Sequence, residues 1–230
     1  MKIEIWSDII CPFCYLGKKK LERAIENVGL KDNVEIIWRS FQLDPEFPSD
    51  KAVPSIQYLV ERKGYPIQQI NQIQKDLVER SLPYGIDFQF DKSLTFNSLK
   101  AHQLLHWSKK FGKSDQLKEV LLKAYFTEGL DLSKDEVLAE QVVKVVLSQN
   151  EALEVILTKE FLDEVDSDCY QATQIGVRGV PFFLINNRTS ISGAQEDQVF
   201  EQLLKTEMIQ SGIALKSASE GLCSLEEGCD

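Results

Sequence analysis

The sequence predicts an α/β fold with a long helical segment inserted between its two halves. Residues 2–6 alternate polar and apolar side chains, as a strand does, and helical spacing follows over residues 14–28. Residues 33–43 are again rich in β-branched and aromatic side chains. Strand, helix and strand in this order form a βαβ unit, which implies parallel pairing. A second group of strand signals begins only at residue 179.

The middle of the chain is almost wholly helical in pattern. From about residue 55 to about residue 166, apolar residues recur at helical spacing. Ser133 and Glu136 have the spacing of a capping box. Apolar residues at helical spacing first indicate one helix from Ile56 and another from Ile67. The candidate helices that follow are residues 97–111, 115–128, 135–148 and 151–163. We therefore expect a helical insertion over residues 45–166.

The C-terminal part returns to strand signals. Asn186-Asn187-Arg188 has turn composition, because Asn tolerates the left-handed backbone of tight turns. The expected elements are a helix at 167–176, strands at 179–185 and 189–192, and a helix at 195–210. The acidic tail from residue 211 to residue 230 is expected to be irregular.

A Cys-x-x-Cys pair stands where the first strand gives way to the first helix. Pro12 suits the first helical turn, since the N–H that it lacks has no partner there. Free N–H groups and the helix dipole favour a thiolate at Cys11. Cys11 is therefore the expected nucleophile, and Cys14, one turn further in, the resolving thiol. The Lys18–Lys20 run is expected to form a solvated helix face.

Metal binding is the alternative reading of this pair. A structural zinc site needs four ligands, and the sequence has no second Cys-x-x-Cys. His102 and His106 are four residues apart on a predicted helix and could supply two imidazoles, but nothing in the sequence brings them to the cysteines. Redox chemistry is the favoured reading, with no metal, and the histidines are expected on a partly buried helix face.

Composition and charge narrow the functional classes. The chain has 230 residues, is 43% hydrophobic and carries a net charge of −10. The acidic balance argues against nucleic acid as the main partner. No apolar run reaches membrane-spanning length, and the polar start does not fit the core of a signal peptide. We therefore expect a cytoplasmic protein with no membrane partner; the sequence leaves the oligomeric state open.

Three segments together resemble a known family. They are residues 6–17, with Cys-Pro-Phe-Cys, residues 124–133, and residues 175–183, with Gly-Val-Pro. The chain is similar to the DsbA-type thioredoxin-fold oxidoreductases, specifically their cytosolic FrnE-like branch. The resemblance implies a thioredoxin-like domain, a mixed β-sheet with flanking helices made of residues 1–44 and 167–212, which carries the helical insertion.

The resemblance also implies roles for individual residues. Cys11 matches the nucleophile and Cys14 the resolving thiol. Pro181 matches the cis-proline that faces the pair, and Val180 the residue whose backbone pairs with an incoming peptide. Phe13 departs from the histidine of the periplasmic enzymes and the tryptophan of many relatives. It offers the thiolate no hydrogen bond or charge, so we expect a weaker oxidant than DsbA.

The other three cysteines lie outside this motif. Cys169 is expected to be a buried small apolar residue in a helix. Cys223 and Cys229 lie in the acidic tail, with five residues between them, where a local disulfide is geometrically easy. Similar pairs in FrnE-like proteins imply an auxiliary redox pair here, and a reactive tail without function is the equal alternative.

The leading functional hypothesis is a protein disulfide oxidoreductase. Its expected partners are protein, peptide or small-molecule disulfides and a cytosolic thiol reductant, with no cofactor beyond the redox-active disulfide. Glutathione is a candidate co-substrate. One alternative is a glutathione-dependent enzyme like the kappa-class transferases and hydroxychromene-carboxylate isomerases, which usually carry Ser at the position of Cys11. Another is a redox-sensing or chaperone-like binding module.

Overall fold

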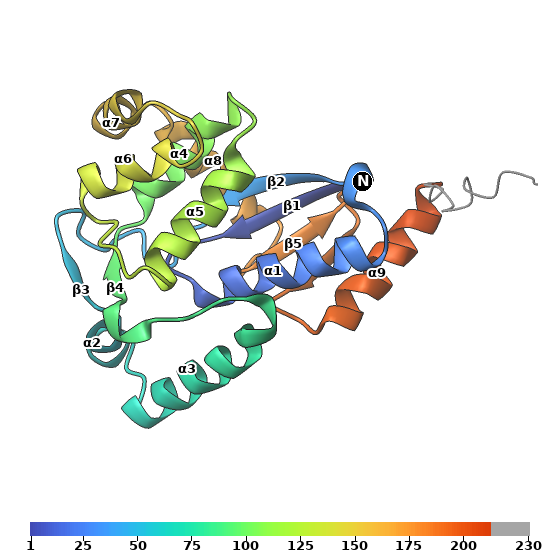
Figure 1. The fold of residues 1–230 in the computed structure, drawn as a ribbon, viewed down its shortest axis with the longest axis horizontal. Coiled ribbons are helices and arrows are strands. Elements are labelled where there is room, and N and C mark those ends of the chain that lie inside the picture. Colours follow the sequence, from blue (N-terminus) through green and yellow to red (C-terminus); the bar gives the residue numbers. More distant parts are fainter. Residues whose placement is uncertain (213–230) are drawn as a thin grey trace, which may run out of the picture.

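A computed structural model describes residues 1–212 and centres on a four-stranded mixed sheet, in the order β2-β1-β5-β6 (Figure 1). Strand β1 (Lys2–Ser7) pairs in parallel with β2 (Glu35–Ser40). On its other side it pairs antiparallel with β5 (Phe182–Ile185), which pairs with β6 (Thr189–Ser192). The βαβ unit and the C-terminal hairpin predicted from the sequence are therefore confirmed.

Helices cover both faces of this sheet. Helix α1 (Pro12–Asn27) and helix α9 (Asp197–Gln210) lie side by side on one face, where Ile3 and Ile5 of β1 contribute to the shared core (Figure 1). Helix α8 (Leu162–Gln174) packs on the other face. The alternation of side chains along β1 explains this division, because successive residues point to opposite faces.

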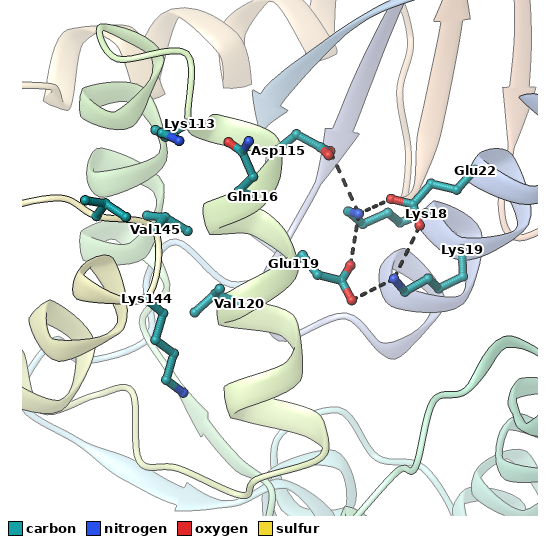
Figure 2. A pocket seen from close by; sticks show the side chains of 11 residues that line it. Lys18, Lys19, Glu22, Lys113, Asp115, Gln116, Glu119, Val120, Lys144 and Val145 are labelled. Atoms are coloured by element: carbon teal, nitrogen blue, oxygen red, sulfur yellow. Dashed lines mark hydrogen bonds and ion pairs between the residues drawn. The ribbon is translucent and has the colours of Figure 1, made fainter. Parts of the chain in front are cut away.

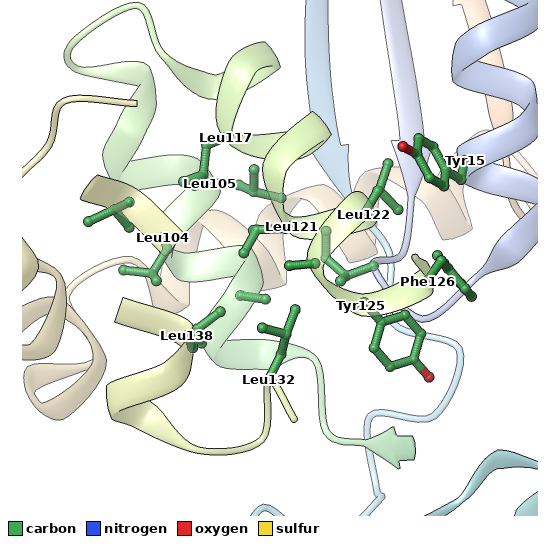
Figure 3. Packing of buried hydrophobic residues seen from close by; sticks show 14 of the residues in the cluster. Tyr15, Leu104, Leu105, Leu117, Leu121, Leu122, Tyr125, Phe126, Leu132 and Leu138 are labelled. Atoms are coloured by element: carbon green, nitrogen blue, oxygen red, sulfur yellow. The ribbon is translucent and has the colours of Figure 1, made fainter. Parts of the chain in front are cut away.

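Between β2 and α8, the chain forms the expected helical insertion. The largest core of the insertion packs leucines of several helices against aromatic side chains that reach the first turns of α1 (Figure 3). The helices of the insertion are α2 (Ser55–Glu61), α3 (Ile67–Ser81), α4 (Leu99–Lys109), α5 (Ser114–Phe126), α6 (Asp135–Val143) and α7 (Gln149–Thr158).

No helix among residues 1–212 is long and apolar enough to cross a membrane.

The insertion contains one addition to the helical pattern. Strands β3 (Ala52–Pro54) and β4 (Leu94–Phe96) pair antiparallel in a separate two-stranded sheet. Each strand is three residues long, too short to show a period in the sequence. The division of the chain into a thioredoxin-like domain and an insertion subdomain stays a prediction.

Two local predictions were wrong. Helix α7 ends at Thr158 because Lys159 takes a left-handed backbone, with φ of 55°, and α8 already begins at Leu162. The expected capping box is absent from the start of α6, whose N-cap is Lys134. The Ser133 hydroxyl instead donates to the Asp131 carboxylate at 2.5 Å, a nearer acceptor on its own loop.

The Lys18–Lys20 run is not a solvated face. Lys18 and Lys20 are only 3% and 2% exposed, because α9 packs against α1 and Lys18 faces an acidic side chain of α5. The Lys18 ammonium lies 2.9 Å from the Glu119 carboxylate of α5 and also pairs with Glu22, as Figure 2 shows. Lys20 pairs with Glu196 before α9 at 3.0 Å. The lysine stems thus pack within helix interfaces while their charges meet acidic partners.

Candidate active site

Cys11 is the N-cap residue of α1, as the sequence predicted. Its backbone is extended, its carbonyl accepts the N–H of Cys14 at 3.0 Å, and Pro12 begins the helix. The Cys11 thiol donates a hydrogen bond to the carbonyl of Val180 at 3.5 Å. Both cysteines are buried thiols, 4% and 1% exposed. The geometry therefore joins the start of α1 to a loop 169 residues later.

That loop lies directly against α1. The Val180–Pro181 peptide bond is cis, and the carbonyl of Pro181 accepts the N–H of Gly193 at 2.8 Å, which ties the loop to the end of β6. A Cβ atom on Gly17 would lie 2.9 Å from Cγ of Pro181. Glycine at this position is therefore what allows the helix to approach the proline so closely.

A cavity with a volume of about 540 Å³ lies beside Cys11. Its walls come from α2, α3 and the aromatic core of the insertion on one side, and from Pro12, Phe13 and Val180 on the other. Phe13 stands at its mouth and is 36% exposed. The wall is mostly apolar, formed chiefly by Ile10, Leu43, Tyr58, Leu59, Tyr65, Ile70, Ile73, Leu77, Phe90, Tyr125 and Phe126. Such a cavity suits an apolar or aromatic group placed next to the reactive sulfur.

A buried carboxylate behind the cysteines was not singled out from the sequence. The Asp8 side chain is 0% exposed, accepts the N–H of Leu43 at 2.8 Å, and lies 3.3 Å from Nε2 of His102. Burial acts to raise the pKa of Asp8, but the contact with His102 and the bond from Leu43 outweigh it and lower the pKa. Asp8 is therefore held ionised three residues before Cys11.

A buried lysine completes this region. Lys118 of α5 is 1% exposed, and its Nζ atom lies 5.2 Å from the ring centroid of Trp38. Burial lowers the pKa of Lys118 to about 8, against the opposing charges of Cys14, Asp8 and Cys11. One feature of the sequence indicates that Lys118 is buried. It lies three residues before Leu121 and four before Leu122, within an apolar helical stripe.

The electrostatics of Cys14 depend on the same groups. Burial raises the pKa of Cys14 well above its usual value, and the neighbouring Cys11 raises it further. The positive charge of Lys118 and a hydrogen bond from the backbone of Asp8 act in the opposite direction. The Cys14 thiol is thus buried, and these two neighbours are what favour its ionisation.

The histidines do not meet the cysteine pair as metal ligands. His106 lies 3.0 Å from the carboxylate of Asp168 and 3.0 Å from the hydroxyl of Ser40. Among residues 1–212, no group of three or more His, Cys, Asp or Glu side chains could hold a metal ion.

Cys169 does not line the cavity beside Cys11. Cys169 of α8 is partly buried, and burial raises the pKa of its thiol. Its thiol lies 3.8 Å from the carbonyl of Ser40. Cys223 and Cys229 lie outside the described residues, so the auxiliary pair stays a prediction.

Comparison with known proteins places this geometry in a family. The family model described as DSBA-like thioredoxin domain matches residues 2–205. The probable DsbA oxidoreductase SCO1869 from Streptomyces coelicolor is 31% identical, with a TM-score of 0.85 over 93% of this chain and 91% of that one.

Two solved structures with lower identity share the fold. A 2-hydroxychromene-2-carboxylate isomerase is 17% identical, with a TM-score of 0.68 over 92% of this chain and 96% of its own. The cytosolic disulfide reductase DsbM from Pseudomonas aeruginosa is 14% identical, with a TM-score of 0.65 over 91% of this chain and 100% of its own. The resemblance inferred from the sequence is confirmed: the chain belongs to the family of DSBA-like thioredoxin domains.

Proposed function

We propose that this protein is a thiol–disulfide oxidoreductase in which Cys11 attacks a substrate disulfide and Cys14 resolves the mixed disulfide. One observation carries the proposal: Cys11 caps α1, contacts the carbonyl before Pro181, and lines the apolar cavity, while Cys14 is buried behind it. A nucleophilic thiol at the cavity and a sheltered second thiol are what a two-step exchange requires.

The cavity indicates the substrate class. Its lining is mostly apolar, and Lys63 is the one residue of the lining with a cationic side chain. The ammonium of Lys63 lies 3.9 Å from the Asp44 carboxylate and over the ring of Tyr58. We infer that the favoured substrates are disulfides flanked by apolar or aromatic groups, such as peptides, rather than strongly anionic ones. The backbone of Val180 is the proposed strand-addition contact for such a peptide.

The remaining components of the reaction are also proposals. The site needs no cofactor other than the cysteine pair, and a small thiol reductant, with glutathione as a candidate, would regenerate it. The cytosolic disulfide reductase DsbM shares the fold, which is consistent with a cytoplasmic role. In that compartment, a net flow of electrons towards the substrate is favoured.

A second candidate is a glutathione-dependent isomerase or transferase. The fold shared with 2-hydroxychromene-2-carboxylate isomerase and the apolar cavity beside Cys11 favour it, because an aromatic substrate would fit that cavity. This activity would need no resolving thiol, since enzymes of this kind usually carry Ser at the position of Cys11. The two functions therefore differ in their dependence on Cys14.

Insulin reduction with dithiothreitol tests the proposal. The wild-type protein should accelerate it, Cys11→Ser should abolish the acceleration, and Cys14→Ser should accumulate a mixed disulfide. Cys169→Ser is the matched control, since Cys169 lies outside the cavity lining. Glutathione-dependent turnover that survives Cys14→Ser would favour the second candidate. Prevention of aggregation that survives the loss of both cysteines would favour a chaperone-like module.

A further inference from the structure

The cavity beside Cys11 has a group of hydroxyls in an otherwise apolar wall. They belong to Ser55, Ser93, Thr95 and Tyr125, which we call the polar floor. The last three of these residues are buried, and Ser55 is half-buried. A buried hydroxyl is costly unless it forms hydrogen bonds. The bonds that these four side chains already make therefore indicate what the polar floor is able to bind.

The two-stranded sheet of the insertion builds most of the polar floor. Strands β3 and β4 pair antiparallel, with Thr95 opposite Val53. Successive residues of an extended chain point to opposite sides, which explains why Ser93 and Thr95 line the cavity and Leu94 between them does not. The N–H of Ser55, at the start of α2, donates to the carbonyl of Ser93 at 2.9 Å. This bond holds the beginning of α2 beside β4.

The fourth hydroxyl comes from the last turn of α5. Figure 3 shows the ring of Tyr125 with its hydroxyl directed away from the leucines of the core. That hydroxyl donates to the carbonyl of Leu94 at 2.6 Å. A carbonyl oxygen only accepts, so the single hydrogen of Tyr125 is used in this bond. The contact of 3.4 Å between the hydroxyls of Tyr125 and Ser55 therefore has Ser55 as its donor.

The hydrogens of the polar floor are all used within the protein. Thr95 donates to Ser55 at 3.3 Å, and Ser55 donates to Tyr125. Ser93 donates to the carbonyl of Gln89 at 3.5 Å. Each hydroxyl has one hydrogen but two acceptor positions, and within residues 1–212 no group donates to the oxygen of Thr95. The polar floor thus offers acceptors to a ligand, and no donor.

Thr95 is the strongest of these acceptors. It stands at the head of a chain of three hydrogen bonds that ends at a backbone carbonyl. Hydrogen bonds in such a chain polarise one another, so a hydroxyl that donates into the chain becomes a better acceptor. Both acceptor positions of the Thr95 oxygen are open among the described residues. A ligand group that donates a hydrogen is therefore the best match for this position.

The rest of the lining fits an apolar ring. Ile70 and Leu77 of α3 and Phe126 of α5 are buried and line the same cavity. Its volume of 540 Å³ lies within the range of sites that enclose a small ligand. Cys11 is part of the lining as well, so a disulfide that meets Cys11 places a neighbouring group in this cavity. The complementary group is an aromatic ring with a hydrogen-bond donor at its far end.

We propose that the polar floor selects substrates, and that Thr95 is the specificity residue that accepts a hydrogen bond from an aromatic side chain beside the substrate cysteine. Tyrosine has this form, with a ring for the apolar wall and a phenol O–H for the acceptor. Phenylalanine fills the wall but leaves the acceptor buried and unpaired. A site that is built to bind a hydroxyl discriminates against the analogue that lacks it. The inference rests on the proposed function and names the group that its substrate carries.

Two pairs of peptide disulfides test the inference. In one pair, tyrosine or phenylalanine follows the cysteine, and in the other pair it precedes the cysteine. Reduced full-length protein converts each symmetric peptide disulfide to two peptide thiols, while Cys11 and Cys14 are oxidised to a disulfide. Acid quenching and chromatography of the released thiol give a second-order rate constant for each peptide. In at least one pair, the tyrosine peptide should react about tenfold faster, the effect of one hydrogen bond gained and one acceptor left unpaired.

A third peptide and three variants identify the donor and the acceptor. O-Methyltyrosine has the oxygen without the hydrogen, so its peptide should react no faster than the phenylalanine peptide. Thr95→Val, which is similar in shape, should bring the ratio of the tyrosine rate to the phenylalanine rate close to one. Thr95→Ser keeps the hydroxyl and should keep the preference. Thr206→Val on α9 is the matched control, because Thr206 lies outside the cavity lining.

Equal rates for tyrosine and phenylalanine in both pairs of peptides would overturn the inference. An O-methyltyrosine peptide as fast as the tyrosine peptide, or a preference that persists in Thr95→Val, would also overturn it. The peptide comparisons use the wild-type protein, so they decide the matter if Thr95→Val does not fold. A wild-type protein that releases no peptide thiol, or a Cys11→Ser variant that releases it at the same rate, would overturn the proposed function instead.

Discussion

Gly17 of α1 and Pro181 of the β5 loop lie so close that a Cβ atom on the glycine would stand 2.9 Å from the proline Cγ. The same Cβ would stand 3.2 Å from the ring of Phe183. The proline ring cannot swing away as a long side chain would. The absence of a side chain at Gly17 thus sets the distance between the helix that carries both cysteines and the loop that contacts Cys11.

Gly17→Ala should therefore destabilise the protein and reduce its activity. An added methyl in a closely packed interface costs about 1–3 kcal/mol. Urea unfolding measures the stability, and insulin reduction measures the activity. Gly179→Ala is the control for stability, since a Cβ there meets nothing within 4 Å. Equal unfolding midpoints for the two variants would contradict the proposed packing constraint.

A charge in the cavity should weaken the binding of apolar substrates. Ile73 lines the cavity and is 36% exposed. Ile73→Lys should raise KM about tenfold, the equivalent of 1.4 kcal/mol, for a peptide disulfide with a neighbouring phenylalanine. The reaction of Cys11 with a small disulfide should stay the same. The control is Val199→Lys on α9, since Val199 lies outside the cavity lining. A similar rise in the KM of this control would argue against specific binding of the substrate in the cavity.

Lys118→Met should stabilise the protein. Folding lowers the pKa of Lys118 from 10.5 to about 8, which corresponds to about 3 kcal/mol of unfavourable free energy at neutral pH. Methionine fills a similar volume without charge, so the free energy of unfolding should rise by up to about that amount. Urea unfolding at neutral pH measures it. A large loss of stability would show that the lysine has a compensating partner that the methionine cannot replace.

The stability should fall in mild acid because of His102. Burial lowers the pKa of His102 below 6.5, although its contact with Asp8 acts to raise it. The unfolded chain therefore takes up a proton before the folded protein does, so unfolding becomes easier as the pH falls below 6.5. The slope is at most about 1.4 kcal/mol per pH unit. Urea titrations across this range measure it.

His102→Gln should remove this slope, because glutamine keeps an N–H for Asp8 but does not titrate. A further loss of stability below about pH 4 should remain in both proteins, since the pKa values of Asp8 and Asp168 are lowered in the fold. Identical slopes for the two proteins near pH 6 would exclude His102 as the group responsible.

A strained residue on the surface of the insertion offers a stabilising change. Val146 has a φ of 65° and is 88% exposed, a backbone region that β-branched residues rarely adopt. Val146→Gly should raise the free energy of unfolding by about 1 kcal/mol. Lys159→Gly, at a φ of 55°, should gain less, because lysine is not β-branched. A thermal unfolding midpoint that falls in Val146→Gly would contradict this prediction.

The sequence predicted the parts of the site that depend on local chemistry. Pro12 at the start of a helix predicts where Cys11 and Cys14 lie without knowledge of distant contacts. The asparagines of the last hairpin likewise predict the turn that they form. The role of Val180 and Pro181 came from resemblance, because no local rule brings them to Cys11. The end of α7 was missed since Lys159 is not a residue type that signals a left-handed backbone.

The buried charges could not be assigned from the sequence for a different reason. Asp8, His102 and Lys118 come from three separated segments, and a lone charged residue in an apolar stripe is compatible with a solvated edge of a helix. Their burial follows only when α4 and α5 pack beside α1. The same applies to Lys18 and Lys20, whose sequence pattern gives no sign of the helices that cover them.

The separation of 169 positions between Cys11 and Val180 also divides the two halves of the site in time. At roughly 5–20 residues per second, the cysteines leave the ribosome on the order of ten seconds or more before the loop that covers them. Throughout that interval, the nascent chain carries two thiols without their partners. The site is complete only when the last strands join the first, so synthesis itself delays its assembly.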